Sequence, residues 1–156
     1  GNINGNDVVL LKPQTFVNII GESVLYIASF LRIDVKDIIC VLEDTTLDVG
    51  DLRVDYMMSS VQHPGIESMA RALKSDRFAK VRVGVGTPDK STKYEDYLLQ
   101  DFTDDENLIL IDVLNKAEEV VRMLLIQNIE EVQNKYNPEG ATKIEKRVIR
   151  KVRIRR

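Results

Sequence analysis

Hydrophobic and polar positions follow two different periods along the chain, and the changes of period divide it into strands and helices. Apolar and alternating runs bounded by turn residues predict strands at 7–13, 37–43, 51–58 and 80–86. Apolar residues spaced three and four apart predict helices over 16–31 and 63–74. The run at 37–43 is apolar on both faces, which predicts a central, buried strand.

The second half of the chain is predicted to be mainly helical. Residues 87–99 are polar and predict a loop, and Thr103 with Glu106 matches the capping box that starts a helix. The helix that follows is expected to end at Asn137, Pro138 and Gly140. Its predicted buried residues are Leu110, Val113, Leu114, Ala117, Val121 and Leu124.

Strands and helices alternate, which predicts an α/β protein with a mixed, mostly parallel sheet in a single three-layer domain. We place this domain at 1–138 and a basic C-terminal extension at 139–156. A chain of 156 residues with 44% hydrophobic content can bury one real core.

Composition narrows the function classes. No apolar run approaches the length of a membrane span, and the first residues lack the basic and apolar regions of a signal peptide. Cys40 and His63 are the only cysteine and histidine, so the sequence predicts no internal disulfide, no zinc site and no cofactor. We expect an intracellular protein, in the cytoplasm or inside an organelle.

Charge is unevenly distributed along the chain. The net charge is −3, yet residues 143–156 hold eight Lys/Arg and one Glu. The preceding 142 residues hold 14 basic and 24 acidic residues, a net charge of about −10. A basic arm on an acidic body is typical of nucleic-acid binding. A solvated end, or an arm that folds back on its own body, would give the same composition.

Four stretches in register resemble the bacterial-type peptidyl-tRNA hydrolase family. They are KPQTFVNIIGESV from Lys12, DIICVLEDTTLDVGDLRV from Asp37, HPGIESMARAL from His63 and FAKVRVGVGTP from Phe78. The resemblance runs from about Val8 to the long C-terminal helix. It implies the family's fold and an ester hydrolase that releases tRNA from peptidyl-tRNA without a metal.

The first stretch is similar to the family motif KPxTxMNxSG. Lys12, Pro13, Thr15, Asn18 and Gly21 match it, whereas Val17 replaces the usual Met and Ile20 the usual Ser. The resemblance implies that Asn18 holds substrate or water through its side-chain amide. An Asn in an apolar helix can instead be a buried structural group.

Glu43 stands where the family has an Asp that orients a catalytic histidine. Glutamate keeps the charge but adds a methylene, which moves the carboxylate beyond the tolerance of a catalytic pair. The adjacent Asp44 could substitute, although neighbouring residues of a strand face opposite sides. Glu43 could also simply end a strand and face water.

His63 matches the histidine of the family motif GHNG, and Gly65 matches its last glycine. Pro64 replaces the family's Asn, which is expected to bind the attacking water or the substrate, and proline offers neither a side-chain donor nor a backbone N–H. The glycine-rich loop before the motif is replaced by MMSSV at 57–61. For a single histidine at a helix start, local capping is the alternative role.

The family's catalytic histidine is expected in a TRHN-like stretch that precedes the residues given. Asn18, Glu43 and His63 are therefore interpreted as a vestigial site with no intact catalytic set. The same missing stretch would carry a central strand. We expect further residues, another chain or a rearranged edge to complete the sheet.

Basic residues define the predicted RNA contacts. The resemblance implies that Arg53 and Arg82 occupy positions that clamp tRNA phosphates, whereas Asp55 has the wrong sign for a third. Together with Asn18, His63 and Gly65, the predicted substrate or RNA-binding residues include five in the basic extension. These are Arg147, Arg150, Lys151, Arg153 and Arg155.

The leading hypothesis is a degenerate peptidyl-tRNA hydrolase-like protein that binds tRNA or ribosomal RNA, alone or with ribosomal proteins, as a ribosome-associated component. The split charge fits a mitochondrial ribosome. The alternative is an active peptidyl-tRNA hydrolase whose catalytic histidine lies outside these residues. A purely structural protein in a large assembly is the third hypothesis.

Overall fold

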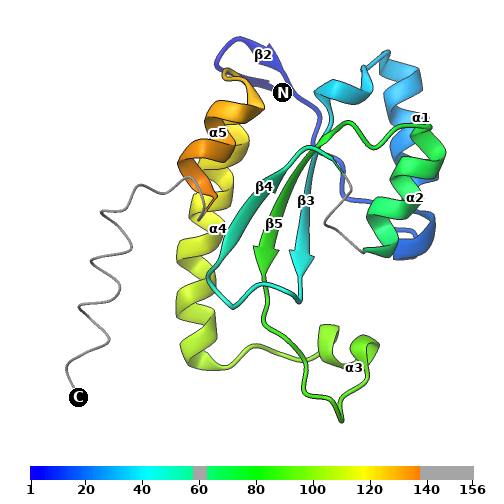
Figure 1. Ribbon diagram of the computed structural model, residues 1–156. Helices are drawn as coiled ribbons and strands as arrows, with labels where there is room; N and C mark the ends of the chain where they lie inside the picture. The colour runs from blue at the N-terminus through cyan, green and yellow to red at the C-terminus, as the bar shows by residue number, and fades with distance from the viewer. Residues whose placement is uncertain (58–62, 138–156) are drawn as a thin grey trace. The chain divides into compact units, whose positions relative to one another are not determined.

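The computed structural model describes residues 1–57 and 63–137, which form two compact units (Figure 1). Within the described residues, the first unit consists of 1–40 and 55–80, and the second of 41–54 and 81–137. The single-domain boundary at residue 138 stays a prediction.

The first unit is built mainly from two helices. Its elements are β1 (Asn2–Ile3), β2 (Asn6–Asp7), the 3-10 helix η1 (Val17–Ile19), α1 (Ile20–Leu31), the 3-10 helix η2 (Val35–Asp37) and α2 (Pro64–Leu73). Helix α1 packs closely on α2 because Gly21 has no side chain. A Cβ at Gly21 would lie 2.2 Å from the Ser68 carbonyl oxygen, and the Gly21 N–H donates to Ser68 Oγ at 3.0 Å.

The helical part of the second unit consists of α3 (Tyr94–Leu98), α4 (Asp104–Leu124) and α5 (Ile129–Tyr136). The predicted capping box is confirmed: Thr103 Oγ1 accepts from the Glu106 N–H, and the Glu106 carboxylate accepts from the Thr103 N–H. Helix α5 starts at a second cap, where Asn128 Oδ1 accepts from the Glu131 N–H at 2.9 Å.

Three strands form the main sheet: β3 (Ile39–Asp44), β4 (Leu52–Asp55) and β5 (Ala79–Gly84), in the order β3-β5-β4. The N–H of Ala79 donates to Ile38 O, and that of Val85 to Asp44 O, a constant offset that makes β3 and β5 parallel. The N–H of Gly84 donates to Asp51 O, so the end of β5 meets the start of β4 and this pair is antiparallel. The predicted α/β class with a mixed sheet is confirmed.

The strand predicted at 37–43 is not central among the strands that the structure describes. Among the described strands β5 is central, and all six of its residues are buried, whereas Val41 of β3 is 52% exposed. The apolar pattern of 37–43 predicts a strand with buried residues but does not say where in the sheet that strand lies. The strand predicted at 80–86 is observed as Ala79–Gly84, and even its charged residues Lys80 and Arg82 are buried.

The N-terminal strand predicted at 7–13 is not observed. Only Asn6–Asp7 forms a strand, antiparallel to Asn2–Ile3, and Val8 continues the pairing with hydrogen bonds to Gly1. Residues 9–13 are in no strand. Leu10 is 88% exposed. Apolar residues favour an extended segment, but a strand also needs neighbouring backbone to hydrogen-bond with.

Three helix predictions need correction. The segment predicted as a loop contains the short helix α3, and the single long helix is two, because Asn128 starts a new one. Leu114 was expected to be buried and is exposed, while Val120 takes its place in the core. Phe16 precedes α1 and is exposed. None of the described helices is long and apolar enough to cross a membrane.

Candidate functional site

The predicted site residues fall in both units. Asn18 and His63 belong to the first unit, and Glu43, Arg53 and Arg82 to the second. Asn18 lies in η1, just before α1, with its side chain exposed. The alternative reading of Asn18 as a buried structural amide is therefore wrong. An exposed amide at a helix entry can donate and accept hydrogen bonds with a ligand.

His63 is buried and caps the N-terminus of α2. Its Nδ1 accepts from the backbone N–H of Gly65 at 3.1 Å and from that of Ile66 at 3.4 Å. Capping satisfies donors that an α-helix leaves unpaired in its first turn. The capping role considered for this histidine is confirmed.

Pro64 and Gly65 fit this cap. Pro64 is the first residue of α2, where a missing N–H has no cost, and it is exposed. Gly65 is buried, and a Cβ there would lie 2.8 Å from Ile20 Cδ1 and 3.0 Å from His63 Cε1. The glycine therefore leaves room for the imidazole, which is a structural reason for its presence at this position.

Glu43 lies half-buried on β3 and lines a cavity of about 590 Å³ in the second unit. Val85, Tyr97 and Phe102 supply apolar walls, and Asp101 and Glu106 add two further carboxylates. Burial, followed by the nearby Glu43 carboxylate, raises the pKa of the Tyr94 hydroxyl. The cavity combines an apolar lining with negative charge.

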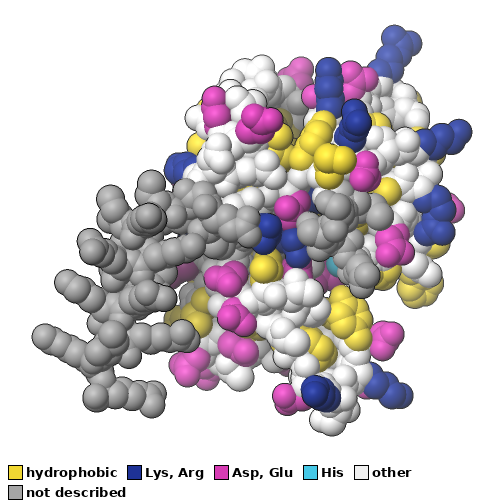
Figure 2. Space-filling view, in the orientation of Figure 1, with side chains coloured by type: hydrophobic (Ala, Val, Ile, Leu, Met, Phe, Trp, Pro, Cys, Tyr) yellow, Lys and Arg dark blue, Asp and Glu magenta, His cyan; other side chains and the backbone are white. Residues whose placement is uncertain are grey.

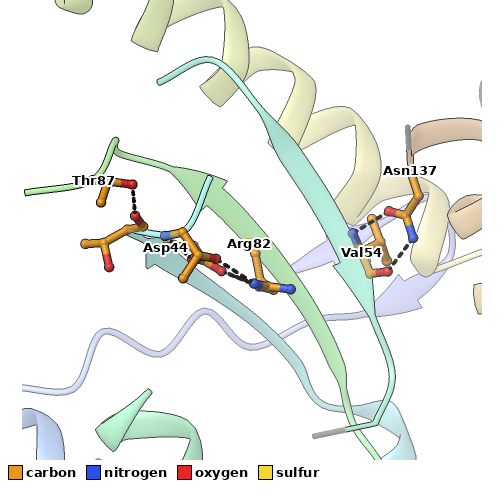
Figure 3. A network of polar contacts seen from close by, with 7 residues as sticks. Asp44, Val54, Arg82, Thr87 and Asn137 are labelled. Carbon is orange, nitrogen blue, oxygen red and sulfur yellow. Dashed lines mark hydrogen bonds and ion pairs between the residues drawn. The ribbon is translucent and has the colours of Figure 1, made fainter. Parts of the chain in front are cut away.

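Asp44 points into a different environment from Glu43. Its carboxylate forms a buried ion pair with the Arg82 guanidinium and accepts hydrogen bonds from the N–H of Thr46 at 2.7 Å and its hydroxyl at 2.6 Å (Figure 3). Burial raises the pKa of this carboxyl, but the Thr46 hydrogen bonds and Arg82 outweigh it, so the pKa lies below its ordinary value. Asp44 is committed to this pair.

The structure places the two predicted tRNA-clamp arginines differently. Arg53 is half-buried on β4, while the Arg82 side chain is buried and bound to Asp44. RNA contact by either residue stays a prediction. The five predicted contacts from Arg147 to Arg155 lie outside the described residues, as does most of the loop at 57–61.

Asn137 attaches the end of α5 to β4. Its Nδ2 donates to Val54 O at 2.9 Å, and its Oδ1 accepts from the Val54 N–H at 2.8 Å (Figure 3). Gln133 Nε2 donates to the same carbonyl at 3.0 Å. The side-chain amide thus pairs with both backbone polar groups of one residue.

Lys80 is fully buried in the first unit, where backbone carbonyls bind its ammonium. Its Nζ donates to the carbonyls of Tyr56 at 2.9 Å, Asp76 at 2.8 Å and Phe78 at 3.0 Å, and it lies 4.1 Å from the centroid of the Phe78 ring. Burial lowers its pKa, partly offset by the charges of Asp76, Cys40 and Asp55. Two backbone segments, at Tyr56 and at Asp76–Phe78, therefore meet at this ammonium.

Sequence reasoning missed several of these roles. The Asp44–Arg82 pair and the buried Lys80 were hidden because charged residues in an alternating strand predict a wet face. The link from Asn137 to Val54 joins residues 83 apart in sequence, which no local pattern can indicate. Among the described residues, no group of three or more His, Cys, Asp or Glu could hold a metal ion.

Comparison with known proteins identifies relatives of this chain. A family model described as peptidyl-tRNA hydrolase matches residues 1–147. The peptidyl-tRNA hydrolase of Clostridium botulinum strain Hall is 38% identical over 137 residues, which cover 88% of this chain and 71% of that protein. The peptidyl-tRNA hydrolase of Alkaliphilus oremlandii is 37% identical over 137 residues, covering 88% and 74%.

Solved structures agree on the fold. The crystal structure of peptidyl-tRNA hydrolase from Acinetobacter baumannii superposes with a TM-score of 0.80 at 24% identity, covering 88% of this chain and 70% of that one. With the matched family model and relatives above 30% identity, the conclusion is plain: the chain belongs to the peptidyl-tRNA hydrolase family.

Proposed function

We propose that this chain is a tRNA-binding member of the family in which ester hydrolysis is lost or strongly reduced. The substrate class comes from its relatives, which are named peptidyl-tRNA hydrolases. The observation that supports reduced hydrolysis is Pro64, which stands where the motif has an amide side chain next to His63. The His63 Nδ1 is occupied by the first turn of α2.

A general base needs an unprotonated nitrogen directed at the reacting water. In His63 the unprotonated nitrogen is Nδ1, because it accepts from two backbone N–H groups. Taking a proton from water would require the ring to give up the cap. His63 therefore holds the start of α2 and does not stand in for the catalytic histidine that the resemblance places before these residues.

The neighbouring positions support the same proposal. Pro64 has no side-chain amide with which to hold a water. Glu43 carries the charge expected of its position, but Asp44 cannot replace it, because its carboxylate is bound to Arg82 and Thr46. A working carboxylate–imidazole pair requires closer placement than a longer side chain readily gives.

An active peptidyl-tRNA hydrolase is the second candidate. Identity of 38% to a relative with that name favours it, as does the exposed Asn18 amide at a motif position. In this case the site would keep its substrate contacts, and Glu43 would carry the family's carboxylate role in a shifted geometry.

Single-turnover hydrolysis of a peptidyl-tRNA separates the two candidates. We expect the protein to bind the tRNA while releasing no more peptide than buffer does. Glu43→Ala is the test variant, and Glu95→Ala, an exposed carboxylate on α3, is its matched control. Release that Glu43→Ala abolishes and Glu95→Ala leaves intact would establish the active enzyme instead.

Ribosome association through the basic extension is a finer part of the proposal. Lys and Arg bind phosphates largely by releasing counterions, so affinity for tRNA or ribosomal RNA should fall steeply as salt rises. Deleting residues 143–156 should flatten this salt dependence. A mitochondrial or other organellar location is best tested by fractionation of cells, and recovery only in the cytoplasm would contradict it.

A further inference from the structure

The outward face of α4 carries aliphatic side chains that nothing in the described residues covers. Leu108 is 67% exposed and Ile111 is 58% exposed, three residues apart on the side of the helix away from the buried Val113 and Ala117. Leu114 extends the strip and is 49% exposed. Isolated exposed aliphatics are common, but a strip along one helix face indicates a binding surface.

Carboxylates border this strip. Asp104, Asp105 and Asp112 are exposed, and in residues 1–57 and 63–137 no ion pair of theirs is found. Figure 2 shows Asp and Glu side chains over the N-terminal end of α4. We call the surface formed by Asp104, Leu108, Ile111 and Asp112 the α4 outward face.

The second unit is acidic well beyond this face. Residues 41–54 and 81–137 hold 16 Asp/Glu and 7 Lys/Arg, a net charge of −9. Further along α4, Glu118 pairs with Arg122 at 2.8 Å and Glu119 with Lys135 at 3.2 Å. The partner that the α4 outward face would take is therefore basic and carries aliphatic side chains of its own.

Residues 143–156 of the same chain have this chemistry. The segment holds eight Lys/Arg against one Glu, and it also carries five aliphatic side chains. These are Ile144, Val148, Ile149, Val152 and Ile154. A purely nucleic-acid-binding arm needs the positive charge but has no need of this many aliphatics.

The segment can reach the face. Helix α5 lies against α4, with Tyr136 OH 3.2 Å from Met123 Sδ, so the described chain ends at Asn137 beside the C-terminal part of α4. Leu108 precedes Met123 on α4 by a distance of about 22 Å at the helical rise. Ten extended residues span up to roughly 33 Å, so the residues from about 147 onward can meet Leu108 and Asp112.

We propose that residues 143–156 dock on the α4 outward face of the same molecule. The aliphatic side chains of the segment cover Leu108 and Ile111, and its Lys and Arg residues meet the carboxylates of Asp104, Asp105 and Asp112. Docking removes the basic segment from solvent until a stronger polyanion displaces it. This inference does not depend on whether the protein hydrolyses peptidyl-tRNA.

Limited trypsin digestion tests the docking directly, because the segment is rich in Lys and Arg and its cleavage is followed by intact mass. The test variant is Leu108→Ser/Asp112→Asn in the full chain, free of nucleic acid. The matched control is Leu99→Ser/Glu95→Gln, which changes an exposed leucine and an exposed carboxylate near α3. Circular dichroism melting checks that both variants fold like the parent protein.

Cleavage within 143–156 tracks the undocked population when docking is fast. We expect cleavage to be roughly five-fold faster in the test variant than in the parent, because the variant loses part of the free energy of docking. The control should be cleaved at the same rate as the parent. Raising the salt concentration should accelerate cleavage in the parent and have little effect on the test variant.

Three results would overturn the proposal. Equal cleavage rates in the parent and the test variant would show that residues 143–156 do not dock on the α4 outward face. Protection that grows with protein concentration would show docking on a second copy. Protection that appears only after tRNA is added, equally in all variants, would show a segment that binds RNA alone.

Discussion

Two buried cations lie two residues apart on β5 and are stabilised in opposite ways. Lys80, in the first unit, is surrounded by three backbone carbonyls and an aromatic ring. Arg82, in the second unit, is neutralised by the Asp44 carboxylate. The contrast separates stabilisation by dipoles from stabilisation by an opposite charge, within one strand.

The difference predicts how much stability each site should lose when its partner or its cation is replaced. Carbonyl dipoles satisfy the hydrogen-bonding needs of the Lys80 ammonium, and the charges of nearby acidic groups offset only part of its burial, so its pKa is lowered. A carboxylate cancels the charge, so its removal leaves the buried guanidinium without that countercharge. Removing that carboxylate should cost more than removing a cation held by dipoles.

The largest expected effect is at Asp44. Asp44→Ala leaves the Arg82 guanidinium buried without its countercharge, and we expect a loss of roughly 3–5 kcal/mol in the free energy of unfolding. Urea denaturation measures it. The double variant Asp44→Leu/Arg82→Met should recover most of this loss, because an apolar pair of similar volume needs no countercharge. A double variant as unstable as Asp44→Ala would contradict the assignment.

The second effect is at Lys80. Lys80→Met keeps the aliphatic stem but leaves three carbonyls without their donor, and we expect a loss of about 2 kcal/mol in the free energy of unfolding. Lys116→Met, on the exposed side of α4, is the control and should change little. A loss at Lys80 larger than that of Asp44→Ala would reverse the order that the comparison predicts.

Asn137 offers a third, uncharged case. Asn137→Ala removes both hydrogen bonds to Val54, and we expect a loss of about 1–2 kcal/mol in the free energy of unfolding. Asn137→Asp should be at least as damaging, because a carboxylate cannot donate to the Val54 carbonyl. Asn134→Ala, exposed on the same helix, is the control. Hydrogen exchange at the Val54 amide gives a local readout, and unchanged protection would contradict the link.

The smallest expected effect is on how the free energy of unfolding depends on pH, which should differ between the Asp44–Arg82 pair and Lys80. The pKa of Asp44 is lowered in the folded state, so its stabilisation is present above 3.8 and is lost as pH falls through the folded value. The pKa of Lys80 is lowered from 10.5, so stability should rise as pH climbs from the folded value towards 10.5. Urea denaturation midpoints measured across the pH range follow both the acidic and the alkaline change in stability. Asp44→Leu/Arg82→Met should reduce only the acidic one, and Lys80→Met only the alkaline one.

Local patterns predicted the fold well where local chemistry decides it. The Thr103 capping box and the Pro64 helix start were readable because caps depend on residues three or four apart. The position of β3 within the sheet and the end of the long helix before Asn128 could not be predicted from local patterns. Both depend on pairing and packing partners that lie far away in sequence.

The candidate site was predictable in position more than in role. The motif order identified Asn18, Glu43 and His63, and the helix-start position correctly suggested a cap for His63. Nothing local indicated that Arg82 would be buried against Asp44, because an arginine in an alternating strand equally fits an exposed face. Sequence spacing gives the face of a strand but does not say what covers that face.

The pairing of Asn137 with Val54 also bears on solubility. Strand β4 ends the described order β3-β5-β4, so the backbone groups of Val54 that bind Asn137 would otherwise face outward. Exposed strand edges recruit strands from other molecules and nucleate aggregation. A side-chain amide that occupies both groups blocks that edge at its third residue. A chain that loses Asn137 should therefore aggregate at lower concentrations, even where its folded structure survives.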